Sequence, residues 1–258
     1  MIKQILPIIL ILISLSACDH FSRTRNRTKT ANGESKEVIV DENGDSIMVY
    51  YRKDGSIRSK AMFKNRYKNG PAYNYYEDGK VQNLIHYKDG FKHGLAIWYY
   101  KSGKKYRETN YFEGQKDGVQ KFYYETGELK AEVPYKKGQL QLGTKEYTKS
   151  GKIIRDYPRI IVNPIDRLKE ENRYYLQFSL DPPRKRVLYY MVKKVNGTEA
   201  KIGLDSFTKN GVARYPYVLY PGQSVMEKVE IRAEIKSRRK IPVIIRRTYN
   251  LAAENRNW

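Results

Sequence analysis

A repeat with a period of 24 residues constrains this chain more than any other feature of its sequence. Five columns of glycine or aromatic residues recur at this spacing and keep one register. A repeat array stacks similar supersecondary units, and each unit supplies part of one continuous core. The columns are Gly55, Gly79, Gly103, Gly127 and Gly151; Tyr51, Tyr75, Tyr99, Tyr123 and Tyr147; Phe63, Tyr87, Tyr111 and Tyr135; Gly90, Gly114 and Gly138; and Gly70, Gly94 and Gly118.

Each unit is expected to contain two strands and two turns. A glycine preceded by Asp, Ser or Thr supplies the positive φ of the first turn, as in Asp54-Gly55. The second turn is predicted to end in Asn69-Gly70, His93-Gly94 and Asp117-Gly118, because Asn, His and Asp tolerate positive φ. His93 is therefore interpreted as a turn residue and not as a ligand. Between the turns, apolar and polar residues alternate with period two, which is typical of antiparallel strands with one apolar face.

The unit pattern, Tyr-Tyr-x-x-x-Gly followed by Tyr-x-x-Gly-x-x-x-Gly, resembles the MORN repeat in its bacterial variant form. The resemblance covers about residues 47–153. It implies a lengthening sheet of stacked hairpins. The last unit departs from the pattern, because Thr148 replaces the second tyrosine and Gly143 lies one place late. A repeat that departs from the pattern in this way is typical of the end of an array.

The paired aromatic residues are the candidate binding residues of the array. Neighbouring residues of a strand point to opposite faces of the sheet, so each pair places one ring on each face. One face is expected to form the core. The other is either an exposed aromatic ladder for a glycan or a protein, or a second packed layer between repeats. The candidates are Tyr75, Trp98, Tyr99, Tyr100, Tyr123 and Tyr124, with Trp98 the best single contact residue.

The amino terminus has the properties of an export signal. Lys3 precedes an apolar run, Ile5 to Ile13, that is too short for a permanent membrane span. The run ends in Leu15-Ser16-Ala17-Cys18, which resembles a bacterial lipobox. The resemblance implies that Cys18, the single cysteine of the chain, is acylated and becomes the new amino terminus. The alternative is an ordinary signal peptide that contains a cysteine.

The sequence predicts four segments: a lipoprotein signal peptide at 1–17, a flexible basic tether at 18–37, the hairpin repeats at 38–155, and a β-sandwich-like domain at 156–258. The tether is polar, and its arginines either attract anionic lipid or serve as a solvated spacer. The last segment contains strand-like runs separated by turn signals, with a linker at Pro158 and Pro164. The fold class is all-β.

The chain carries 50 Lys and Arg against 28 Asp and Glu. The excess is spread, with 28 against 17 in residues 18–155 and 21 against 11 in residues 156–258. A nucleic-acid site would concentrate it, so no nucleic-acid partner is expected. The spread charge instead favours anionic envelope polymers or lipid headgroups, and solubility alone is the alternative. With one cysteine and three histidines, the sequence predicts no enzyme, metal or cofactor.

Three functions are compatible with these features. The first is a non-catalytic lipoprotein, anchored in a membrane of the bacterial cell envelope, whose repeat sheet binds another envelope protein. The membrane is either the outer membrane or the periplasmic face of the inner membrane. The second is a lipoprotein that binds glycan or peptidoglycan through an aromatic ladder. The third, which follows from the resemblance, is an antitoxin or immunity protein for a cognate toxin, a function that the export signal disfavours.

Overall fold

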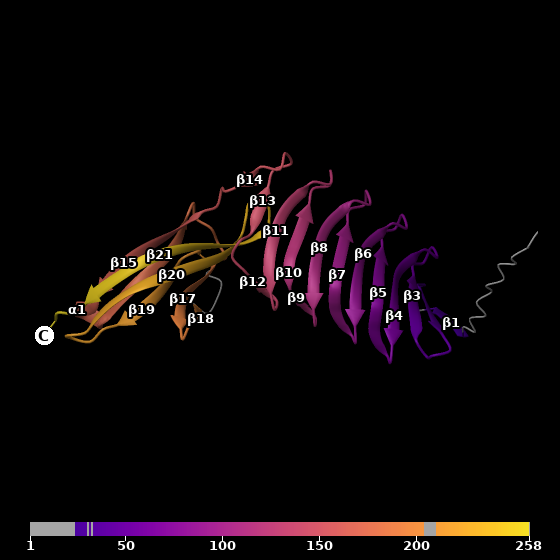
Figure 1. Ribbon diagram of the computed structural model, residues 1–258, viewed down its shortest axis with the longest axis horizontal. Coiled ribbons are helices and arrows are strands. Elements are labelled where there is room, and N and C mark those ends of the chain that lie inside the picture. Colours follow the sequence, from indigo (N-terminus) through magenta and orange to yellow (C-terminus); the bar gives the residue numbers. More distant parts are fainter. Residues whose placement is uncertain (1–23, 30, 32, 204–209, 258) are drawn as a thin grey trace, which may run out of the picture.

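The computed structural model describes residues 24–257 except 30, 32 and 204–209, and describes only the backbone of 194 and 195. The leader and Cys18 lie outside the described residues. Fourteen strands form one antiparallel sheet that follows the order of the sequence (Figure 1). The strands are β1 (Thr24–Lys29), β2 (Ser35–Val40), β3 (Ser46–Tyr51), β4 (Ile57–Lys64), β5 (Tyr67–Tyr75), β6 (Val81–Lys88), β7 (Phe91–Tyr99), β8 (Lys105–Phe112), β9 (Gln115–Lys116), β10 (Gly118–Tyr123), β11 (Leu129–Lys136), β12 (Gln139–Leu140), β13 (Lys145–Tyr147) and β14 (Ile153–Ile154).

The sheet begins earlier than the sequence predicts. The segment expected to be a flexible tether, 18–37, contributes β1 and the start of β2, which pair with each other in register. A strand at the edge of a sheet is held mainly by backbone hydrogen bonds to its one neighbour and need not bury an apolar face. A polar, basic segment can therefore form such a strand. Arg27 secures the pair by donating to Ser35 Oγ at 3.0 Å and lying 4.4 Å from the Tyr51 ring centroid.

The first predicted turn is confirmed, and the second is wrong. Gly55 and its equivalents close the loops between β3 and β4 and between the following pairs, with φ near +80° at Gly55 and Gly79. Gly70 and Gly94 also have positive φ, but they lie inside β5 and β7, where the register shifts. The second connection is instead a tight turn such as Asp89-Gly90. Glycine with positive φ serves a bulge as well as a turn, so the glycine column alone did not distinguish them.

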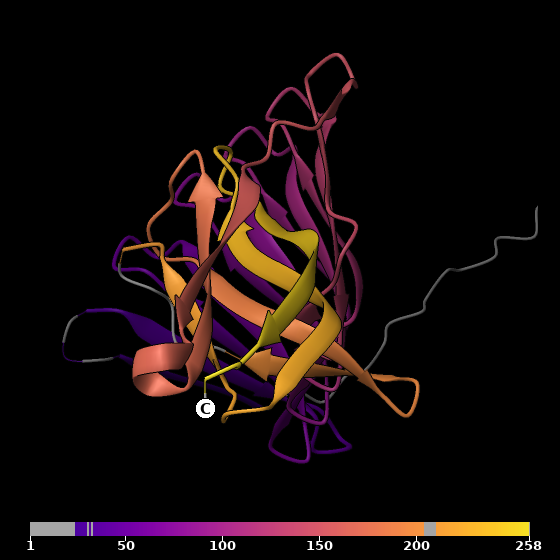
Figure 2. The same ribbon diagram turned by 90° about the vertical axis from the view of Figure 1, so that its left-hand side faces the viewer.

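Residues 159–254 form the predicted β-sandwich. One sheet has the order β15-β16-β19 and the other β18-β17-β20-β21, which is the connectivity of an immunoglobulin-like sandwich. Figure 2 views the molecule from the end that this sandwich occupies. Its core holds fully buried residues of both sheets, such as Phe178, Tyr189 and Ile231. The elements are β15 (Arg159–Arg167), α1 (Leu168–Glu171), β16 (Arg173–Asp181), β17 (Leu188–Val195), β18 (Thr198–Gly203), β19 (Ala213–Val218), β20 (Ser224–Lys236) and β21 (Pro242–Glu254).

The predicted linker at Pro158 and Pro164 is shorter than expected, because Pro164 lies in the middle of β15 opposite Leu176. β15 is an edge strand, with β16 on one side only. Proline has no N–H to donate, and an edge strand needs no donor on its open side.

The turn between β20 and β21 joins the sandwich to the array. Ile241, which is 2% exposed, packs with Phe122, Ala131 and Val133 of the repeat sheet. The buried carboxylate of Glu146 accepts a hydrogen bond from Ser237 Oγ at 3.0 Å. The sandwich therefore covers the end of the array's core, as a capping unit must.

Candidate binding face of the repeat sheet

The second tyrosine of each pair connects one repeat to the next. Its ring is half-buried, and its hydroxyl donates to the backbone carbonyl of the tyrosine 23 residues ahead. The three bonds run from Tyr76 to Tyr99 at 2.6 Å, from Tyr100 to Tyr123 at 2.8 Å, and from Tyr124 to Tyr147 at 2.7 Å. These hydroxyls are used in holding the array together. The binding role predicted for Tyr100 and Tyr124 stays a prediction.

The first tyrosines of the pairs lie on one face, together with Glu108 and Glu132. Tyr123 donates to Glu108 at 2.6 Å, and burial together with this carboxylate raises the pKa of Tyr123. Tyr75 stacks on Tyr73 with ring centroids 6.1 Å apart, and burial raises its pKa. Tyr99 is half-buried as well. The paired tyrosines therefore do not form an exposed row.

Trp98 lies on the opposite face, and a cation covers it. The register pairs Trp98 with Arg107, whose Cζ lies 3.9 Å from the ring centroid. The Nε of Arg107 is buried and has no hydrogen-bond partner among the described residues. Cations over an indole face are among the stronger cation–π pairs, so this contact fixes the guanidinium in place.

A periodic set of lysines and tyrosines lies on the same face as Trp98. In each case the ammonium of one strand or its short extension lies over a ring of the same repeat unit. The Nζ to centroid distances are 5.0 Å for Lys68 over Tyr87, 5.1 Å for Lys92 over Tyr111, and 4.3 Å for Lys116 over Tyr135. We call these six residues the lysine–tyrosine ladder. The tyrosine column was recognised from the sequence, but the lysines were missed, although they recur at the same 24-residue spacing.

On the face that carries the ladder, the charged side chains of β4–β11 are all basic. By the strand register, none of the residues of β4–β11 that share this face is acidic, whereas Glu108 and Glu132 belong to the other face. None of the ladder lysines, nor Arg107, forms a salt bridge within the described part of the chain. Burial, with the charges of Arg107 and Lys92, lowers the pKa of Lys116. We call this surface the ladder face.

The ladder continues into a cleft between the array and the sandwich. Leu140, which pairs with Tyr135, lines a cavity of about 1050 Å³ there. Basic side chains dominate its lining. They are Arg184, Lys185, Arg186 and Lys236, with Glu234 as the acidic member. Cationic surface therefore extends from the ladder to the junction.

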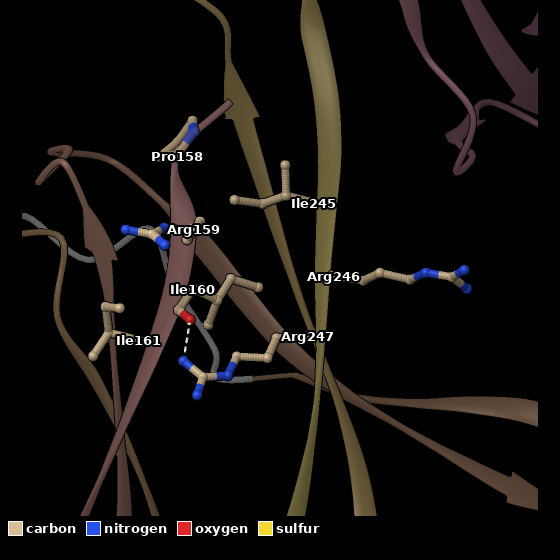
Figure 3. Close-up of a pocket in the computed structure, with 7 residues that line it drawn as sticks. All are labelled: Pro158, Arg159, Ile160, Ile161, Ile245, Arg246 and Arg247. Atoms are coloured by element: carbon tan, nitrogen blue, oxygen red, sulfur yellow. Dashed lines mark hydrogen bonds between the residues drawn. The ribbon is translucent and has the colours of Figure 1, made fainter. Parts of the chain in front are cut away.

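A second cavity, of about 610 Å³, lies at the edge of the sandwich between β15 and β21 (Figure 3). Its arginines have structural contacts. Arg247 donates to the carbonyl of Ile160 at 2.6 Å and so links the two sheets, and Arg159 pairs with Asp181 at 3.2 Å. Arg246 points away from the cavity (Figure 3). This arrangement closes the edge of the sandwich and presents no convergent binding groups.

The remaining candidate chemistry is sparse. His93 lies in β7 and its ring packs on Phe112 with centroids 5.3 Å apart, while His86 Nδ1 lies 2.8 Å from the carbonyl of Leu95. Among the described residues, no three His, Cys, Asp or Glu side chains come together in a way that could hold a metal ion. No helix within the same part of the chain is long and apolar enough to cross a membrane.

Comparison with known families identifies the three central units. Residues 68–89, 92–113 and 116–137 match the family model described as MORN repeat variant. The resemblance predicted from the sequence is confirmed over these units, each of which begins at a ladder lysine. A search of curated proteins finds no match.

Proposed function

We propose that the chain is a non-catalytic lipoprotein of the bacterial cell envelope that binds another envelope protein through the ladder face. The lipobox at Cys18 supports the membrane anchor. The observation that carries the binding role is the ladder face itself. It is a regular surface of half-buried rings and cations that have no carboxylate partners among the described residues.

The structure favours the ladder face over the paired tyrosines as the binding surface. The second tyrosines hold neighbouring repeats through their hydroxyls, and Tyr123 is paired with Glu108. Within the described residues, by contrast, the ladder cations make no salt bridge that would have to break before a ligand binds. An acidic partner would gain charge-assisted contacts without displacing internal ones.

The test is crosslinked co-purification of the full-length, lipidated protein from detergent-solubilised envelopes. A double variant, Lys92→Gln with Lys116→Gln, removes two ladder charges. The matched control, Lys88→Gln with Lys136→Gln, removes two exposed lysines from the opposite face of neighbouring strands. A discrete protein captured by the wild type and the control, and lost in the ladder variant, supports the proposal. Capture of cell-wall glycan in its place would contradict it.

The anchor is tested separately by Cys18→Ser. Wild-type protein should carry acyl chains, detected by intact-mass measurement, and should remain with the membrane fraction. The variant should lack the acyl mass. An unmodified cysteine in the mature wild-type protein would contradict the lipoprotein assignment.

A further inference from the structure

We propose that the ladder face binds an acidic segment in the polyproline II conformation, with a carboxylate at every third residue and its axis across the strands. This inference rests on the proposed function and names the chemistry of the partner. Three observations carry it: the spacing of the lysines, the rings beside them, and the lack of acidic residues among those of β4–β11 that share the face.

The spacing follows from the fold. Equivalent residues of successive hairpins lie two strands apart, which corresponds to about 9.6 Å at the usual strand separation. Three residues of polyproline II rise about 9.3 Å and return to the same side of the helix. A β-strand instead repeats its side every second residue, at about 6.7 Å. Only the first of these two conformations places successive carboxylates on successive ladder lysines.

The rings supply the second element of recognition. Each tyrosine of the ladder is half-buried, and burial raises the pKa of Tyr87, Tyr111 and Tyr135. The rings therefore remain neutral at physiological pH. Proline-rich helices dock on aromatic-lined grooves because their conformation is already fixed and little entropy is lost on binding. The parts of these half-buried rings that the ammonium groups leave uncovered offer such a surface to the non-acidic residues.

The charges supply the third element. Lys116 is half-buried beside Arg107 and Lys92, and burial and these two charges lower its pKa. A carboxylate placed above this group would relieve the repulsion. The basic cleft at Leu140 and Lys236 then provides further cationic surface for a longer acidic segment.

The experiment measures binding of two labelled peptides to the full-length protein in detergent micelles by fluorescence anisotropy at low salt. The phased peptide is four Pro-Pro-Glu units. The comparison peptide has the same composition, but its four glutamates are contiguous. We expect the phased peptide to bind at least about five-fold more tightly, the equivalent of one well-placed ion pair.

The variants described above locate the site. Lys92→Gln with Lys116→Gln should weaken binding of the phased peptide by roughly 10- to 25-fold, and Lys88→Gln with Lys136→Gln by less than about two-fold. Circular dichroism of each variant checks that the fold is retained. Equal affinity for both peptides, or equal losses in both double variants, would overturn the inference in favour of a diffuse charge effect. Tighter binding of inorganic polyphosphate than of the phased peptide would overturn it in favour of a phosphate polymer.

The two proposals fail separately. If the phased peptide binds through the ladder but no envelope protein is captured, the proposed function fails and the ligand chemistry stands. If an envelope protein is captured through the ladder but the phased peptide neither binds nor displaces it, the function stands and the inference fails.

Discussion

Replacing Tyr100 with phenylalanine tests whether the tyrosine hydroxyls hold the array together. The change removes the bond of 2.8 Å to the carbonyl of Tyr123 and keeps the ring, which packs edge-on against Tyr106 at 5.2 Å. A neutral hydrogen bond contributes about 0.5–1.5 kcal/mol, and a buried carbonyl left without its donor costs more. Because Tyr100 is half-buried, water reaches part of this site. We expect a loss of about 1 kcal/mol in the free energy of unfolding.

Urea unfolding followed by circular dichroism measures this loss. With a slope of about 2 kcal/mol per molar urea, the midpoint should fall by roughly 0.5 M. Tyr99→Phe is the matched control, because it makes the same chemical change in the adjacent residue. The Tyr99 hydroxyl has no hydrogen bond to a described residue, so its midpoint should move by less than about 0.2 M.

Equal midpoints for the two variants would refute the reasoning, because the hydrogen bond of the Tyr100 hydroxyl would then add nothing to the stability. A change in slope would instead show that the repeats no longer unfold together, which is a known behaviour of arrays with weakened interfaces.

Three further predictions concern the rest of the fold. Ile241→Ala should cost about 2–5 kcal/mol and separate the unfolding of the array from that of the sandwich, visible as two calorimetric transitions. The pKa of Glu108 is lowered, because hydrogen bonds from Lys105 and Tyr123 together outweigh the larger single effect of burial. The stability that the ionised Glu108 carboxylate contributes is therefore present above about pH 4.5 and is lost as pH falls through the lowered pKa. The urea midpoints of the wild type and of Glu108→Gln should consequently converge in acid. Gly94→Ala should cost roughly 1–2 kcal/mol in urea unfolding despite open space around the site, because its φ is +77°.

Periodicity predicted the array well because it samples the same structural position several times. The glycines of the first turn, the alternation within strands and the three central repeats all followed from columns at 24-residue spacing. The bulges were missed because Gly70 and Gly94 satisfy a bulge and a turn with the same positive φ. Distinguishing the two requires knowing which backbone groups pair, and this depends on the neighbouring strand.

The sequence predicted a β-sandwich-like domain in the last segment of the chain, but it did not predict the strands at the edges of its sheets. The runs that became β16, β17, β19, β20 and β21 show clear strand composition. β15 was missed because Pro164 reads as a break, and only its position at the edge of a sheet makes the proline tolerable. Glu146 likewise gave no signal in the sequence, because its burial depends on Ser237, 91 residues away.

A column of residues that recurs with the repeat period can either hold neighbouring repeats together or bind a ligand. The second tyrosines and the ladder lysines recur with equal regularity, but each tyrosine hydroxyl has a partner in the next repeat. The ladder lysines have rings beneath them and, within the part of the chain that the structure describes, no carboxylate in salt-bridge contact. A half-buried cation whose pKa is lowered, such as Lys116, opposes folding wherever it is charged. An acidic ligand removes that opposition, so binding and stability should rise together, as linkage requires of any ligand that prefers the folded state.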